Sequence, residues 1–211
     1  MSIVLYDFWR SSAAFRVRIG LALAGLEWTS VPVDLRAGDN RTPDHLARNP
    51  QGLVPVLDID GLRLTQSLAI LEYLDETRIC GFLPSDPSGR ARVRALAYAV
   101  AMEIHPICNA RVAQMAAEAS RGAFTVDDWM RMHIGPGLAA VEELLDHPAT
   151  GRFCHGDSPT LADICLVPQV ANAARFGIDI GHLTRVNAVA AAMNALPAVH
   201  AVHPDQLRPG A

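Results

Sequence analysis

The sequence predicts a protein of two domains, an α/β domain over residues 1–82 followed by an all-helical domain over residues 88–211. Three observations lead to this prediction. Segments typical of β-strands occur only up to about residue 80. A stretch dense in turn-forming residues, Gly81 to Gly89, comes next and reads as a linker. Beyond it the apolar residues recur at helical spacing and no strand pattern remains.

The first domain opens with two predicted strands that flank a helix. Ile3 to Tyr6 is a short apolar run typical of a buried strand, and Phe15 and Ile19 recur on one face of the helix that follows. The second strand, Trp28 to Val33, contains Pro32. Because proline cannot donate a hydrogen bond to a neighbouring strand, we expect this strand at an edge of the sheet.

A hairpin and another helix complete this domain. Two short segments, Val56–Ile59 and Leu62–Leu64, are separated by Asp60-Gly61, a preferred two-residue turn. Ser67 then precedes an apolar helix, and we expect its side chain to cap that helix. The predicted order of elements is therefore β-α-β followed by β-β-α.

Helical patterns fill the second domain, and they span residues 90–107, 125–145, 160–177 and 186–196. Pro106 interrupts the first of them. Two others open with the spacing of a capping box, Thr125 with Asp128 and Thr160 with Asp163.

The composition limits the classes of protein and partner. The 211 residues carry a net charge of −4 and no lysine-rich tract, so we expect no nucleic-acid partner. The N-terminus lacks a signal-peptide pattern, and no apolar run is long enough for a membrane span. We therefore expect a soluble, cytoplasmic protein without a membrane partner. The four cysteines are scattered and the eight histidines lack metal-ligand spacing, which predicts reduced thiols and no bound metal.

The most informative segment, from Trp9 to Arg16, joins the first strand to the first helix. Ser11 and Ser12 lie at the start of that helix, where unpaired N–H groups and the helix dipole favour a nearby anion. A thiolate is such an anion, and the pKa of a thiol falls at a helix N-terminus. One interpretation is therefore a site that keeps an exogenous thiol ionised, and the other is a simple N-cap.

Two further segments of this domain suit a peptide that carries a carboxylate. A proline that enters a strand through a cis bond turns the N–H and C=O of the preceding residue outward, and Val54-Pro55 is placed to do so; the alternative is an ordinary turn proline. Gln66 and Ser67 lie at another helix start, where main-chain and hydroxyl donors suit a small carboxylate. Sites for a thiolate, a peptide and a carboxylate on one small sheet suggest glutathione.

Sequence markers for a known family are spread nearly end to end: Arg10-Ser11-Ser12, Arg16-Val17-Arg18-Ile19, Val54-Pro55, Gln66-Ser67-Leu68-Ala69-Ile70, Leu166-Val167-Pro168-Gln169-Val170 and Arg175-Phe176. By these markers the chain closely resembles the zeta class of the glutathione transferases, which includes the maleylacetoacetate and maleylpyruvate isomerases. The resemblance implies the glutathione transferase fold, with a thioredoxin-like N-terminal domain and an all-helical C-terminal domain. It also implies a homodimer.

The resemblance assigns roles to individual residues. It implies that Ser11 contacts the glutathione sulfur and that Ser12 supports it. The other implied glutathione contacts are Val54 and a cis Pro55 at the cysteinyl backbone, Gln66 and Ser67 at the γ-glutamyl carboxylate, and His105 and Asn109 from the helical domain. Asp163 matches a helix-capping aspartate of the superfamily, so its implied role is in folding.

One position departs from the pattern of the zeta class. Most members have Cys two residues after the first Ser, whereas this chain has Ala13. The departure weakens any mechanism that needs a protein thiol at this position. It gives more weight to Ser11 and to the helix dipole.

Arginines carry the prediction of the substrate. The isomerases of this family act on small diketo dicarboxylates, and Arg binds carboxylates through a planar pair of donors. The resemblance places Arg10 and Arg175 at such a substrate, with Arg111 as a third positive charge; the alternative for each is a solvated surface charge. We expect Arg16 and Arg18 to be structural or surface residues rather than ligands.

The leading hypothesis is a glutathione-dependent cis–trans isomerase of maleylacetoacetate or maleylpyruvate in the catabolism of aromatic compounds. Its catalytic residues would be Ser11, Ser12, Arg10 and Arg175. The nearest alternative is a transferase that conjugates glutathione to small electrophiles or α-halo acids with the same thiolate. A noncatalytic glutathione-binding scaffold has no need of these residues, and a thioredoxin-like reductase would need a cysteine at the first helix, where this chain has none.

Overall fold

The computed structural model of the chain describes residues 2–208, which divide into two compact units. The first unit contains the residues up to 82 together with those from 196 onward, and the second contains residues 83–195. No helix within residues 2–208 is long and apolar enough to cross a membrane.

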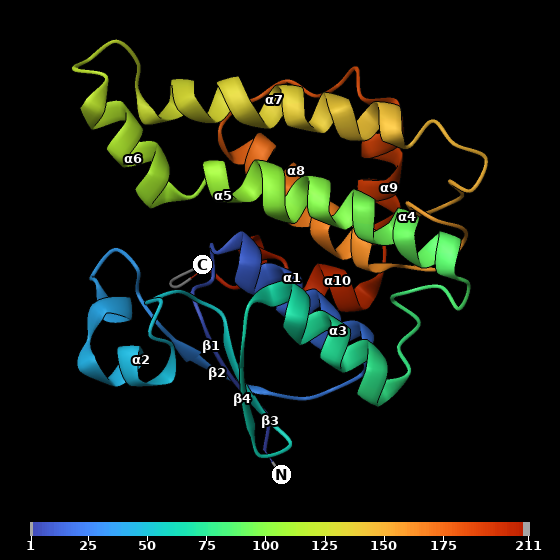
Figure 1. Cartoon of the computed structure of the whole chain (residues 1–211), viewed down its shortest axis with the longest axis horizontal. Coiled ribbons are helices and arrows are strands. Elements are labelled where there is room, and N and C mark those ends of the chain that lie inside the picture. Colours follow the sequence, from blue (N-terminus) through green and yellow to red (C-terminus); the bar gives the residue numbers. More distant parts are fainter. Residues whose placement is uncertain (1, 209–211) are drawn as a thin grey trace. The chain divides into compact units, whose positions relative to one another are not determined.

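A mixed four-stranded sheet in the order β2-β1-β3-β4 forms the base of the first unit (Figure 1). Its strands are β1 (Val4–Asp7), β2 (Thr29–Pro32), β3 (Val56–Ile59) and β4 (Leu62–Thr65). β1 runs parallel to β2 and antiparallel to β3, and β2 lies at an edge, as Pro32 predicts. The predicted hairpin is confirmed, with Asp60 and Gly61 at φ of 53° and 79° in the tight turn.

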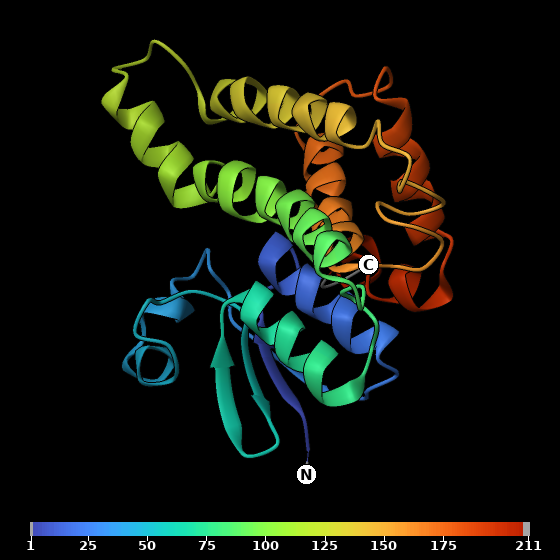
Figure 2. The ribbon, with the colours of Figure 1, turned by 45° about the vertical axis from the view of Figure 1, so that its right-hand side comes forward.

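Helices α1 (Ser12–Leu23) and α3 (Ser67–Arg78) lie side by side against the sheet (Figure 2). Gly20 allows them to approach closely, because a Cβ at this position would collide with the side chain of Leu71. The connection between β2 and β3 contains the remaining short helices of residues 1–82, η1 (Asp39–Arg41) and α2 (Pro43–Arg48).

The residues after 195 belong to the first unit, which differs from the prediction of a helical domain extending to residue 211. Helix α10 (Pro197–Ala201) packs against α1 with Val199 fully buried, and the 3-10 helix η3 (Pro204–Gln206) follows it. Arg18 Nε donates to the C=O of Val202 at 3.4 Å. A helix of five residues is too short for its periodicity to reveal the element on which it packs.

The second unit is helical, as predicted. Its helices are α4 (Pro87–Tyr98), the π-helical segment η2 (Ala99–Ile104), α5 (His105–Ile107), α6 (Ala110–Ala119), α7 (Val126–Leu144), α8 (Leu161–Arg175) and α9 (Thr184–Asn194). Pro106 lies directly after η2, whose wider turn accommodates a residue with no N–H to donate. The sequence patterns left α6 unassigned.

Both predicted capping boxes are present. At α7, Thr125 Oγ1 accepts from the N–H of Asp128 at 3.1 Å, and Asp128 accepts from the N–H of Thr125 at 2.9 Å. At α8, the buried Asp163 carboxylate accepts from the N–H of Thr160 at 2.8 Å and from the N–H of Cys154 at 2.7 Å. Asp163 therefore joins the start of α8 to the preceding loop, a geometry that supports the folding role implied for it.

Glu142 of α7 supplies a further carboxylate cap that the sequence did not reveal. It accepts from the main-chain N–H of Arg185 at 3.0 Å and of Val186 at 2.8 Å, and from the Thr184 hydroxyl at 3.2 Å. Burial by itself would raise the pKa of Glu142, but these hydrogen bonds outweigh burial and hold the pKa below its usual value. The carboxylate thus joins α7 to the start of α9.

We predict that Glu142→Gln lowers the free energy of unfolding by about 1–3 kcal/mol near neutral pH, because the amide leaves donors of α9 without an acceptor. Folding lowers the pKa of Glu142, so its contribution is present above the pKa of the unfolded chain and is lost as pH falls through the lower folded value. The stability difference between wild type and variant should therefore shrink below about pH 4.3 in urea unfolding followed by circular dichroism. A difference that does not change with pH would contradict this assignment.

Candidate active site

The corner between β1 and α1 places Ser11 at the N-cap of α1. Its Oγ accepts a hydrogen bond from the N–H of Ala14 at 3.2 Å, and its own N–H donates to the C=O of Phe8 at 2.8 Å. Ser12 is the first residue of the helix and is partly buried. Because Ser11 Oγ is an acceptor in the cap, its hydroxyl proton can be donated to a ligand. The two interpretations of this corner are therefore compatible, and the cap itself is confirmed.

A buried ion pair behind this corner connects three segments of the first unit. Arg18 of α1 is 1% exposed, and its NH1 lies 2.7 Å from Oδ2 of Asp7 at the end of β1. Arg18 NH2 also donates to the C=O of Trp9 at 2.8 Å. Burial raises the pKa of Asp7 above its usual value, although the Arg18 guanidinium opposes the shift. Together with the bond to Val202, Arg18 fixes the peptide that leads into Ser11.

The Val54–Pro55 peptide bond is cis, as the resemblance implies. Side chains hold the loop before it: Asn49 Nδ2 donates to the C=O of Leu53 at 2.9 Å, and His45 Nε2 lies 3.1 Å from the same oxygen. Among residues 2–208, neither the N–H nor the C=O of Val54 has a hydrogen-bond partner. Both groups are therefore able to pair with an extended ligand.

The prediction that Ser67 caps α3 is wrong. Ser67 is the first residue of the helix, and the cap position is Gln66, whose φ of 67° lies in the left-handed region and whose side chain makes no cap hydrogen bond. Ser67 Oγ accepts instead from Arg16 NH1 at 3.3 Å, and this partner explains the difference. Gln66 Nε2 donates to Oε1 of Gln51 at 2.8 Å. α3 thus begins without a side-chain cap, which suits an anion at its first N–H groups.

Two of the predicted glutathione ligands and one predicted substrate ligand lie where η2 turns into α6 in the second unit. His105 begins α5, and Asn109 is the N-cap of α6, where its Oδ1 accepts from the N–H of Arg111 at 3.0 Å. Trp129 Nε1 donates to the C=O of Ile107 at 2.9 Å. This bond from α7 fixes the turn between His105 and Asn109, a role for Trp129 that the sequence patterns did not indicate.

The remaining predicted substrate ligands are arginines beside aromatic rings. In the first unit the guanidinium carbon of Arg10 lies 5.6 Å from the ring centroid of Trp9 and 5.9 Å from that of Phe8. In the second unit Arg175 is the last residue of α8, and its guanidinium carbon lies 4.9 Å from the ring centroid of Phe176. Each contact is a cation–π interaction that restricts the direction of the guanidinium.

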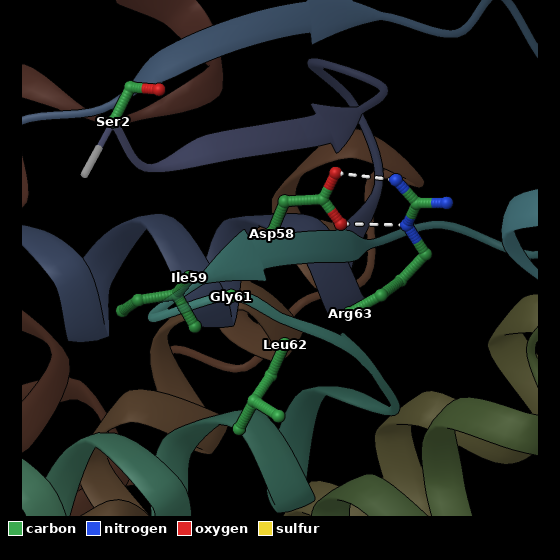
Figure 3. A pocket seen from close by; sticks show the side chains of 6 residues that line it. All are labelled: Ser2, Asp58, Ile59, Gly61, Leu62 and Arg63. Atoms are coloured by element: carbon green, nitrogen blue, oxygen red, sulfur yellow. Dashed lines mark hydrogen bonds and ion pairs between the residues drawn. The ribbon is translucent and has the colours of Figure 1, made fainter.

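A pocket near the start of β1 lies at the opposite end of the strand from Ser11 (Figure 3). Its lining residues are Ser2, Asp58, Ile59, Gly61, Leu62 and Arg63. Arg63 donates to both carboxylate oxygens of Asp58 at 2.7 Å each, and these bonds lower the pKa of Asp58. Since the two charges neutralise one another, we assign no ligand here. No cluster of acidic, His or Cys side chains within residues 2–208 has an arrangement that could hold a metal ion.

Comparison with known proteins identifies the family. Residues 1–76 match the family model described as the glutathione S-transferase N-terminal domain. A maleylacetoacetate isomerase of Rhizobium meliloti (strain 1021) is 59% identical to this chain over 98% of both proteins. The holo structure of a maleylpyruvate isomerase, described as a bacterial glutathione S-transferase of the zeta class, matches with a TM-score of 0.93 and 40% identity and covers 99% of this chain and 100% of its own. The chain belongs to the zeta class of the glutathione transferases.

A further zeta-class comparison adds a ligand-bound relative. A maleylacetoacetate isomerase from Methylobacterium extorquens AM1, solved with bound malonate and glutathione, matches with a TM-score of 0.91 and 44% identity and covers 99% of each chain. The predicted fold is therefore confirmed: the first unit carries the N-terminal domain of the glutathione transferases, and an all-helical region follows it.

We predict that Arg18→Met lowers the free energy of unfolding by about 3–5 kcal/mol, because it leaves the Asp7 carboxyl buried without its cation. The double variant Asp7→Leu/Arg18→Met removes both partners and should recover much of this loss. Urea unfolding of the three proteins at one pH measures the difference. A cost below about 1 kcal/mol for Arg18→Met, the size seen for exposed pairs, would show that the pair does not hold this corner.

Proposed function

We propose that this zeta-class protein is a glutathione-dependent cis–trans isomerase of maleylacetoacetate or maleylpyruvate in the catabolism of aromatic compounds. The observation that carries the proposal is the Ser11 hydroxyl, which caps α1 through its oxygen and retains a proton to donate to a thiolate. The relatives named as isomerases of these two compounds support the reaction class. The relative with glutathione bound supports the cofactor.

Glutathione would bind by its three chemically distinct parts. Its sulfur would lie at the start of α1, with Ser11 as hydrogen-bond donor and Ser12 in support. The cysteinyl backbone would pair with Val54, next to Pro55. The remaining proposed contacts are Gln66 and Ser67 at the γ-glutamyl carboxylate, and His105 and Asn109 from the second unit.

The substrate would be held by its carboxylates. Arg10 and Arg175 carry permanent positive charges with planar donor pairs, and Arg111 adds a third charge. Malonate, which is bound to the Methylobacterium extorquens relative, is itself a small dicarboxylate and supports this substrate class. The same charges would stabilise an oxyanion that develops on the substrate.

The reaction is an addition followed by an elimination. The glutathione thiolate adds to the cis carbon–carbon double bond conjugated with a carbonyl, and the π electrons move onto the carbonyl oxygen to form an enolate. The former double bond is then single and can rotate. When the enolate electrons return, the carbon–sulfur bond breaks, the thiolate leaves and the trans isomer remains. No proton, electron or glutathione is consumed, so the enzyme needs only to position the thiolate and stabilise the enolate.

Ala13 bears on the mechanism and on the competing transferase activity. With Ala at this position the corner offers no protein thiol, so glutathione would be the only nucleophile there. A transferase acting on small electrophiles or α-halo acids would use the same thiolate but would retain the carbon–sulfur bond. The two activities therefore differ in whether glutathione is consumed.

We further propose a cytoplasmic homodimer with domains over residues 1–82 and 88–211. Tyr98 and Met102 are 36% and 56% exposed and are four residues apart along α4 and η2. Residues at this spacing share one face of a helix, so they offer an apolar surface for a second copy.

The proposed function predicts complete conversion of a maleyl substrate with glutathione at a small fraction of the substrate concentration. Both substrates are followed with and without glutathione, and the remaining thiol is titrated at the end. Conversion with no loss of thiol supports an isomerase. Loss of one thiol for each substrate consumed would identify a transferase, and conversion that does not depend on glutathione would refute the proposal.

We predict that Ser11→Ala raises the pKa of bound glutathione and lowers kcat at neutral pH by about tenfold or more, because a hydrogen bond to an ionised group contributes about 1.5–3 kcal/mol. The Kd for glutathione should change less. The measurement is the pH dependence of kcat, with Ser12→Ala as the matched control. Full activity in Ser11→Ala combined with inactive Ser12→Ala would exchange the roles of the two serines.

We predict that Arg10→Ala and Arg175→Ala each raise KM for the dicarboxylate or lower its turnover by about tenfold or more, because each loses a charge-assisted hydrogen bond. Arg131→Ala is the control, since Arg131 is exposed and pairs only with a surface carboxylate in α7. An uncharged electrophile such as chlorodinitrobenzene has no carboxylate and should be affected far less. Equal losses on both substrates would assign these arginines to the glutathione site or to the fold.

A further inference from the structure

Arg16 is a buried arginine that the proposed chemistry does not use. It lies in α1 and is 2% exposed, although arginine is almost never fully buried without a specific partner. Its NH1 donates to Ser67 Oγ, 51 residues further along the chain, at 3.3 Å. The bond crosses from α1 to the first residue of α3, the helix beside it (Figure 2).

This bond constrains the direction of the Ser67 hydroxyl. A guanidinium group has donors only, so Ser67 Oγ must be the acceptor. The hydroxyl has one proton, and that proton must point away from Arg16. Ser67 is 6% exposed and begins a helix without a side-chain cap, so an anion at this helix start would meet both the hydroxyl proton and the first N–H groups.

Without Arg16 the same hydroxyl has other options. Serine near a helix start readily bonds to the main chain of its own turn, and such a bond would use the proton that a ligand needs. At Ser11 the N–H of Ala14 occupies the hydroxyl oxygen in the same way. Arg16 therefore does for the start of α3 what a main-chain N–H does for the start of α1.

We propose that Arg16 is a positioning residue for the amino-acid end of glutathione, acting through Ser67 on the γ-glutamyl carboxylate. The inference rests on the proposed function, because it takes glutathione as the ligand of this helix start. Arg16 does not touch the ligand. It fixes the rotation of the Ser67 hydroxyl, so that binding does not require the hydroxyl to give up a competing bond.

The test compares two ligands by calorimetry, glutathione and γ-aminobutyryl-cysteinylglycine, which lacks the γ-glutamyl carboxylate. Arg16→Met keeps much of the apolar volume but removes the donor. It should weaken glutathione binding about tenfold and weaken binding of the analogue less than about twofold. In a Ser67→Ala background, Arg16→Met should have no further carboxylate-specific effect.

Arg16→Lys keeps a buried cationic donor and is the second variant if Arg16→Met does not fold. It should retain more discrimination between the two ligands than Ser67→Ala retains. Equal weakening of both ligands by either Arg16 variant, or an unchanged affinity for glutathione, would overturn the inference. If wild type binds neither ligand, the proposed function itself fails, and that outcome is distinct from a wild type that binds glutathione but shows no dependence on Arg16.

Discussion

The hydrogen bond that Ser11 Oγ accepts from the N–H of Ala14 is the interaction on which the proposed chemistry depends. It makes the serine oxygen an acceptor within the protein and leaves the hydroxyl proton for a sulfur anion. A thiol at this position also lies near the positive end of the α1 dipole, and both effects favour its ionised form. Ser11 thus joins a structural cap to a chemical role, and neither interpretation of the corner excludes the other.

The rest of the first unit holds this corner and the neighbouring binding elements in place. Arg18 ties the end of β1 and the peptide after Phe8 to the residues that follow α9, through Asp7, Trp9 and Val202. On the other side of the sheet's central strands, the amide of Asn49 holds the loop that enters β3. These contacts involve backbone oxygens and buried charges, so they fix positions more strongly than exposed pairs would.

The sequence predicted the fold and the location of the candidate site well, because strand alternation, the Asp60-Gly61 turn and the two capping boxes are local signals. It failed where the deciding partner is distant along the chain. Ser67 has the local signature of an N-cap, but Arg16 takes its oxygen. Arg16 and Arg18 were expected to be structural or surface residues. Their burial and their partners at Ser67, Asp7 and Val202 become visible only when the chain is folded.

The same limit applies to the short elements. The packing of α10 on α1 and the helix α6 produced no pattern that could be recognised from residue spacing alone. Substrate preference between the two maleyl compounds is also not a local property, since it depends on where three arginines lie with respect to a bound ligand.

The central claim is that this protein keeps bound glutathione ionised at neutral pH, and the most direct test is an ultraviolet titration of the thiolate in the wild-type complex. The account predicts a thiol pKa clearly below that of free glutathione, so that the thiolate absorbance is already present near pH 7. A bound thiol that titrates at the same pH as free glutathione, in a protein that is fully active as an isomerase, would contradict it.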